Sequence, residues 1–253
     1  MGEALIDYLS SALKQGHSDS GQLLWFGEFA NYPYPQGDGI FQTRLNVVDA
    51  EFKFDPQWPS LTELQLELLF QNDDLFMSSR KGNLEQVALS RVDLQLPSLG
   101  DVKALGIQAA FATTGAKAKS LIDKSPLPEV TDALNNLQVS GELNGKLDLV
   151  IPFTDNDQVA VKGSIDLSND SIYLPALDLT LTDVNGDFKF DDDGLLSTPL
   201  TAKLLGEPLD VSFISAQEND NYQVNVELAG RWSSDKVMTQ LMPAYQQYVS
   251  GEV

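Results

Sequence analysis

The side chains that could carry catalysis are few and scattered. The single histidine, His17, lies among Gly16, Ser18, Asp19 and Ser20, a composition typical of a solvated loop, which makes a histidine base or a two-histidine metal site unexpected. The chain has no cysteine, so disulfides, thiolate metal sites and cysteine nucleophiles are excluded. It also lacks the motifs of serine hydrolases, P-loops and dinucleotide-binding folds. We therefore predict no catalytic residue, no cofactor and no enzyme.

Acidic runs are the next candidates, because hard oxygen ligands could hold calcium. Asp191-Asp192-Asp193-Gly194 and Asp155-Asn156-Asp157 both lack the spaced ligands and distal glutamate of an EF-hand loop. Asp and Asn also favour hairpin tips, so we interpret these runs as turns and predict no metal site. A carboxylate pair for glycoside hydrolysis stays open among 37 acidic residues, because the separation of two carboxylates depends on the fold.

Aromatic residues cluster near the start of the chain and could suggest a sugar-binding site. Trp25, Phe26, Phe29, Tyr32 and Tyr34 lie in and just after a strand-like stretch that runs into prolines. We interpret them as an aromatic-rich strand followed by a proline-stiffened loop that packs on the core.

The composition limits the partners. The chain has 253 residues, 42% of them apolar, which is enough for a sizeable core. Its formal charge of -21 repels phosphate backbones, so we predict no nucleic-acid partner, whereas uncharged acyl chains remain compatible. No run of about 18 apolar residues occurs, and the Met1-Gly2-Glu3 start lacks the features of a signal peptide. We expect a piece of a longer chain whose targeting segment lies upstream.

Strict alternation of apolar and polar residues is the clearest pattern. From residue 137 to 153 the odd positions are mostly apolar and the even ones mostly polar, which predicts a long strand with one apolar face. Gly141 and Gly145 are expected points of bending. Further strands with apolar alternation are predicted at 159–167, 177–182, 184–190, 200–204, 209–213 and 224–232, with less regular candidates at 23–29, 41–54, 64–70, 75–77, 87–96 and 105–111.

Polar tripeptides between these strands predict hairpin tips. They are Ser168-Asn169-Asp170, Glu218-Asn219-Asp220 and the two acidic runs named above.

An internal repeat relates the two halves of the chain. Phe52-Lys53-Phe54-Asp55 recurs 136 residues later as Phe188-Lys189-Phe190-Asp191, and the same offset matches further apolar positions without a gap. Helical patterns precede strands at 4–14, 117–136 and 234–249. We therefore predict a helix-plus-sheet module over 1–116, a second over 117–232 that continues the same sheet, and a truncated third over 233–253.

Each predicted strand has one apolar face, and the predicted helices are too few to cover these faces. A second apolar layer is therefore needed. That layer could be another sheet, the few helices, or a ligand of similar extent. A β-sandwich is the common solution, and periodicity alone does not exclude it.

A family resemblance bears on this choice. Residues 177–211, LDLTLTDVNGDFKFDDDGLLSTPLTAKLLGEPLDV, resemble a signature of the AsmA-like proteins, most closely their YhdP branch. Four further blocks resemble the same family, so the similarity spans nearly the whole chain: Leu23-Leu24-Trp25-Phe26-Gly27, Tyr32-Pro33-Tyr34, Gly39-Ile40-Phe41-Gln42 and Trp58-Pro59.

The resemblance implies an all-β fold in which an elongated, curved antiparallel sheet forms a U-shaped groove with an apolar inner face. It also implies a Gram-negative envelope protein that is anchored in the inner membrane and extends through the periplasm. Its partners would be phospholipid acyl chains, the flanking segments of the same longer chain and, through missing parts, the inner and outer membranes. This chain would be a middle segment.

We hypothesise that the apolar side chains of these strands line the groove. The predicted lining residues are Leu143, Leu147, Leu149, Ile151, Val161, Ile165, Leu179, Leu181, Phe188, Phe190, Val226 and Leu228. Two other functions remain open: a β-sandwich scaffold or interaction module of the envelope that binds no lipid, and a carbohydrate-acting enzyme.

Overall fold

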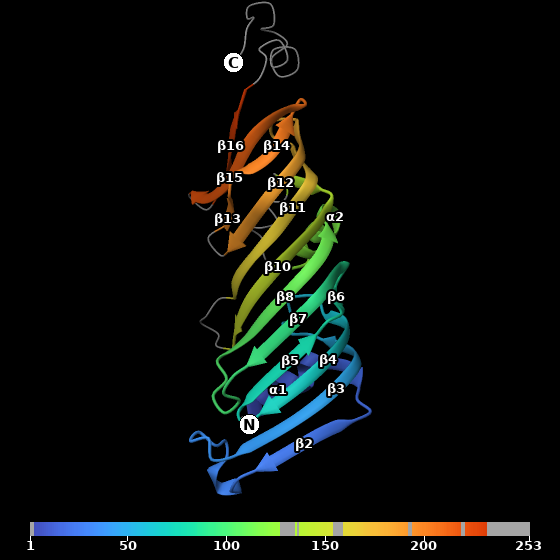
Figure 1. Ribbon diagram of the computed structural model, residues 1–253, viewed down its shortest axis with the longest axis vertical. Coiled ribbons are helices and arrows are strands. Elements are labelled where there is room, and N and C mark those ends of the chain that lie inside the picture. Colours follow the sequence, from blue (N-terminus) through green and yellow to red (C-terminus); the bar gives the residue numbers. More distant parts are fainter. Residues whose placement is uncertain are drawn as a thin grey trace, which may run out of the picture. The chain divides into compact units, whose positions relative to one another are not determined.

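Strands make up most of the described chain, and they pair in one antiparallel sheet. The computed structural model describes residues 3–126, 135, 137–153, 159–191, 194–218 and 221–231 (Figure 1). Within these residues, each strand is hydrogen-bonded to at least one other strand of the same sheet. The predicted all-β, antiparallel fold class is confirmed.

The chain divides into two compact units. Unit 1 comprises Met1–Thr113, Lys117–Pro128 and Asn144–Gly163, and unit 2 comprises Thr114–Ala116, Glu129–Leu143 and Ser164–Val253. The predicted module boundaries near residues 116 and 232 remain a prediction.

Unit 1 contains the first part of the sheet. β3 pairs on one side with β1 and β2, and on the other side the order runs β4, β5, β7, β8 and β10, with β6 pairing with β4 and β7. The strands are β1 (Leu13–His17), β2 (Gly21–Phe26), β3 (Ile40–Phe52), β4 (Leu61–Gln71), β5 (Asp74–Ser79), β6 (Gly82–Leu84), β7 (Val87–Leu96), β8 (Ala104–Thr114) and β10 (Glu142–Pro152), the last beginning with two residues of unit 2.

Unit 2 contains the remaining strands. β9 pairs with β11, β12 pairs with β13 and β14, and β15 pairs with β13, β14 and β16. The bounds are β9 (Gln138–Ser140), β11 (Ala160–Leu174), whose first residues belong to unit 1, β12 (Leu179–Asp191), β13 (Gly194–Ser197), β14 (Leu200–Leu204), β15 (Glu207–Glu218) and β16 (Asn221–Gly230).

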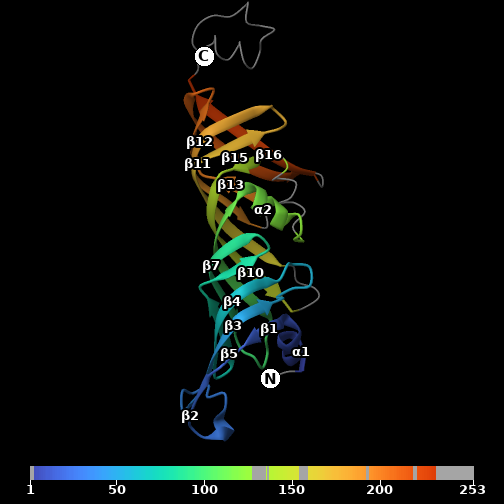
Figure 2. The ribbon, with the colours of Figure 1, turned by 90° about the vertical axis from the view of Figure 1, so that its right-hand side faces the viewer.

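Helices are short. α1 (Glu3–Ala12) and α2 (Gly115–Ile122) correspond to the first two predicted helical stretches, and a 3₁₀ turn, η1 (Phe29–Asn31), follows β2. Figure 2 shows α1 against one face of the unit 1 strands. None of the helices that the structure describes is long and apolar enough to span a bilayer. The third predicted helix, 234–249, lies outside the described residues.

The alternation predicted for residues 137–153 is present. Leu143, Leu149 and Ile151 are buried, whereas their even-numbered neighbours up to Val150 are exposed. Gly141 separates β9 from β10 and has a φ of 132°, a left-handed backbone that favours glycine. The predicted bend at Gly141 is confirmed.

The prediction of a hairpin tip at Ser168-Asn169-Asp170 is wrong. These residues lie inside β11, where Asn169 has a φ of 59° and the buried face passes from Leu167 to Asp170 and Ile172. One Asp170 carboxylate oxygen accepts a hydrogen bond from the Ser168 backbone N–H at 2.7 Å. The polar tripeptide therefore forms a bulge that shifts the buried face by one residue. The change in parity from Leu167 to Ile172 was the signal in the sequence.

The internal repeat extends to strand register. In β3 and β4, Ala50 pairs with Leu64, so the offset of 136 predicts a pair between Gly186 and Leu200. In β12 and β14, the adjacent residues Asn185 and Thr201 form a pair of the same register. A register shift accompanies both pairs. The next hairpin differs, because Leu68 pairs with Met77 whereas Leu204 pairs with Glu207 across a tighter turn.

The Asp170 carboxylate is expected to stabilise the bulge in β11. Asp170→Ala should lower the free energy of unfolding by about 1–3 kcal/mol, because it leaves the Ser168 N–H without its acceptor. Asp166→Ala, on the exposed face of the same strand, should change it by less than about 0.5 kcal/mol. Urea denaturation measures both, and equal effects would contradict the assigned role.

Candidate functional site

A single apolar cluster covers one face of the unit 2 strands. Except for Leu137, its buried members all belong to strands, and they pack against one another. Leu181, Val184, Leu200 and Phe213 have 0% of their surface exposed. The rings of Phe188 and Phe213 lie 5.9 Å apart although β12 and β15 are not adjacent in the sheet. Side chains of non-neighbouring strands therefore meet on this face.

The structure brings eight of the twelve predicted lining residues together. Leu143 and Leu181 are members of the cluster, and the half-buried residues that pack against it include Ile165, Leu179, Phe188, Phe190, Val226 and Leu228. The other four, Leu147, Leu149, Ile151 and Val161, lie on β10 and β11 within unit 1.

Burial divides the twelve residues into two sets. Five of them are at most 5% exposed and contribute to packing: Leu143, Leu149, Ile151, Val161 and Leu181. The other seven are half-buried, so part of each side chain is accessible from outside: Leu147, Ile165, Leu179, Phe188, Phe190, Val226 and Leu228. We call these seven residues the accessible row.

The accessible row offers apolar contact and little else. Its members carry no donor, acceptor or charge, so a ligand would be held by loss of water from apolar surface, at about 0.8 kcal/mol for each buried methylene group. Such side chains neither orient a reacting group nor activate a nucleophile. Extended hydrocarbon is the ligand chemistry that fits them.

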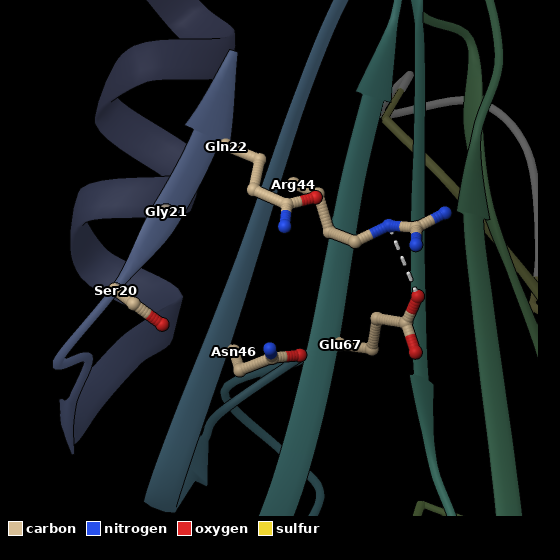
Figure 3. A pocket seen from close by; sticks show the side chains of 6 residues that line it. All are labelled: Ser20, Gly21, Gln22, Arg44, Asn46 and Glu67. Carbon is tan, nitrogen blue, oxygen red and sulfur yellow. Dashed lines mark ion pairs between the residues drawn. The ribbon is translucent and has the colours of Figure 1, made fainter.

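A polar pocket lies in unit 1, on a surface formed by exposed polar side chains. Figure 3 shows its lining residues on the near side of the strands, with α1 behind β2; they are Ser20, Gly21, Gln22, Arg44, Asn46 and Glu67. Arg44 Nε and Glu67 Oε1 are 3.3 Å apart, and both side chains are about half exposed. Glu67 is the one carboxylate in this lining and is paired with a cation. The pocket therefore lacks the two facing carboxylates of a glycosidase.

The interpretation that the aromatic cluster packs on the core is wrong for most of its members. Trp25, Phe26 and Phe29 are 48%, 71% and 71% exposed, whereas Tyr34 is buried at 3%. The Trp25 indole N–H donates to the Tyr34 hydroxyl at 2.7 Å, and the Trp25 and Phe29 rings are 4.8 Å apart. Tyr34 anchors the loop, whereas Trp25 and Phe26 in β2 and Phe29 in η1 lie on the surface.

The candidates for metal and acid–base chemistry stay apart. His17 is exposed at the end of β1. Asp191 pairs with Gly194 across the β12–β13 hairpin, as expected for a tip, and residues 155–157 lie outside the described part of the chain. Among the described residues, no group of three His, Asp or Glu side chains is arranged to hold a metal ion.

Comparison with known proteins identifies the family. The family model described as "YhdP protein" matches residues 1–253. The chain belongs to the YhdP family. It is 36% identical over 255 aligned positions to the Escherichia coli (strain K12) protein named "Intermembrane phospholipid transporter YhdP", which confirms the resemblance noted in the sequence. No solved structure matches the chain.

The alignment covers the two proteins to different extents. It covers all of this chain and 20% of the E. coli protein. The chain thus spans about one fifth of the length of its relative.

Truncation of a buried leucine of the cluster should destabilise the fold more than truncation of an exposed leucine. Leu181→Ala should lower the free energy of unfolding by about 2–5 kcal/mol, because it leaves a cavity in the unit 2 cluster. Leu177→Ala, at a side chain that is 57% exposed, should change it by less than about 0.5 kcal/mol. Chemical denaturation followed by circular dichroism measures both, and a small loss for Leu181→Ala would show that the cluster is loosely packed.

Proposed function

We propose that this chain is a segment of a periplasmic, bridge-like protein that conducts phospholipid acyl chains along the apolar face of its sheet. The full protein would be anchored in the inner membrane and would reach toward the outer membrane through parts outside this segment. The proposal is supported by membership of the YhdP family and by the name of the E. coli relative.

The observation that carries the proposal is the accessible row. Each of its seven residues belongs to an alternating strand whose other face is polar, yet each remains partly exposed. Apolar side chains that fold into a closed core would be buried throughout, as Leu181 and Leu200 are. A surface of this kind is stabilised when hydrocarbon covers it.

Movement along the face follows from the uniformity of its side chains. An acyl chain gains about the same free energy per methylene group wherever it lies, so neighbouring positions have similar affinities. The side chains of the accessible row offer no directional contact such as a hydrogen bond, so none of them holds the lipid at one position. The lipid head group would stay outside, in water, next to the polar strand edges.

Two alternatives are less well supported. A β-sandwich scaffold needs two facing sheets, whereas the described strands belong to one sheet. A carbohydrate-acting enzyme needs convergent carboxylates, and the polar pocket offers Glu67 alone, paired with Arg44.

Flanking segments of a longer chain have a place to join at β2. Among the described strands, β2 pairs with β3 alone, so its other edge is open. Leu23 and Trp25, on the face of β2 opposite Gln22 and the polar pocket, are 67% and 48% exposed. An added strand would pair with the open edge, cover these side chains and extend the apolar face.

A carboxylate in the accessible row tests the function. Leu147→Asp or Ile165→Asp in the full-length protein should lower phospholipid transfer between donor and acceptor vesicles by about tenfold or more, since an acyl chain would have to displace water from the charge. The fold should persist, because both positions are half-buried.

Two matched variants on β10 serve as controls. Val150→Asp, at a side chain that is 49% exposed, should transfer lipid normally, whereas Leu149→Asp, at 2%, should unfold the protein by burying an unpaired charge. Protease resistance reports folding in each variant. Normal transfer by folded Leu147→Asp and Ile165→Asp proteins would refute the conduit.

A further inference from the structure

α1 lies on the apolar side of the unit 1 sheet. In β3, exposed Arg44 and Asn46 alternate with buried Val47, and the pocket they line is on the near side in Figure 3, with α1 behind β2. The last residue of α1, Ala12, is 1% exposed, and its carbonyl oxygen accepts a hydrogen bond from Lys53 N–H at 2.7 Å. The helix therefore covers part of the face that the proposed function assigns to lipid.

One side chain of α1 joins two distant parts of the sheet. The Tyr8 hydroxyl donates to the Phe54 carbonyl oxygen at 2.9 Å, just after β3 ends. The Tyr8 ring lies 4.8 Å from the ring of Phe153, just after β10 ends. Burial, and next the negative charge of Asp55, raise the pKa of the Tyr8 hydroxyl, so it stays protonated and remains a donor.

These contacts require that the unit 1 sheet bends around α1. β3 and β10 are five strand positions apart in the sheet order. In a flat sheet they would be separated by roughly 24 Å, at about 4.8 Å for each neighbouring pair. Phe153 N–H donates to the Lys103 carbonyl oxygen beside β8, so Phe153 does not reach across toward β3. One tyrosine can touch both ends only if the apolar face is concave.

We propose that α1 is a strap across this concave face and that the contact between Tyr8 and Phe153 must part for a lipid head group to pass. The inference rests on the proposed function. Acyl chains can lie against the face beneath a helix, but a hydrated head group cannot enter apolar packing without losing its water. Tyr8 itself makes one ring contact and one hydrogen bond, and Phe153 is 36% exposed, so their contact lies at the surface where it can open.

A reversible crosslink tests the strap. The segment has no cysteine, so Tyr8→Cys with Phe153→Cys in the full-length protein, in a background free of other cysteines, can be joined by a bismaleimide whose linker contains a reducible disulfide and which spans the space of the two rings. Crosslinking should slow the transfer of phosphatidylethanolamine between vesicles by about tenfold or more, and reduction of the linker should restore it. Phe153→Ala alone should transfer at least as fast as the parent protein.

The control is a crosslink of the same kind on the polar face. Asn46 and Glu67 are cross-strand partners in β3 and β4, so Asn46→Cys with Glu67→Cys should leave transfer unchanged when crosslinked in the same way. Equal transfer by the crosslinked and reduced forms of the Tyr8–Phe153 pair would overturn the strap while leaving the conduit intact. Failure of the reduced and parent proteins to transfer lipid would overturn the conduit and, with it, the strap.

Discussion

The structure depends on one constraint: a strand that alternates apolar and polar residues places all of its apolar side chains on one face, and that face must be kept from water. In unit 2, side chains of non-neighbouring strands meet, as Phe188 and Phe213 do. In unit 1, the sheet bends around α1, which Tyr8 holds between Phe54 and Phe153. In each unit, the packing buries some apolar side chains fully and leaves others half-exposed, and the function that we propose depends on the half-exposed ones.

Period-two alternation predicted most of the longer strands, because it follows from the geometry of a single strand. It missed the short strands β1, β6 and β13. β7 begins and ends where the pattern places it, and Gly141 divides β9 from β10 as expected. The bulge at Asn169 was misread as a hairpin tip, since the same polar residues serve in both. Only the change of parity after Leu167 distinguishes them, and it extends over too few residues to stand out.

The site was harder to predict than the fold, because exposure depends on contacts between strands that are distant in the sequence. Leu147 and Leu149 are alike in type and parity, yet the first is half-buried and the second is 2% exposed. Sequence also gave no sign that Tyr8 touches Phe153, since 144 positions separate them and neither belongs to a motif. The exposure of Phe26 and Phe29 was missed because aromatic side chains in strands are most often buried.

The most direct test of the conduit asks which face of one strand touches lipid in the cell. A photoreactive amino acid at Phe188, a half-buried member of the accessible row, should form a covalent adduct with phospholipid in the full-length protein. The same amino acid at Lys189, which is exposed on the other face of β12, should not. Mass spectrometry of the purified protein identifies the adducts. Lipid at position 188 alone is the result this account predicts, and equal labelling or none at both positions would contradict it.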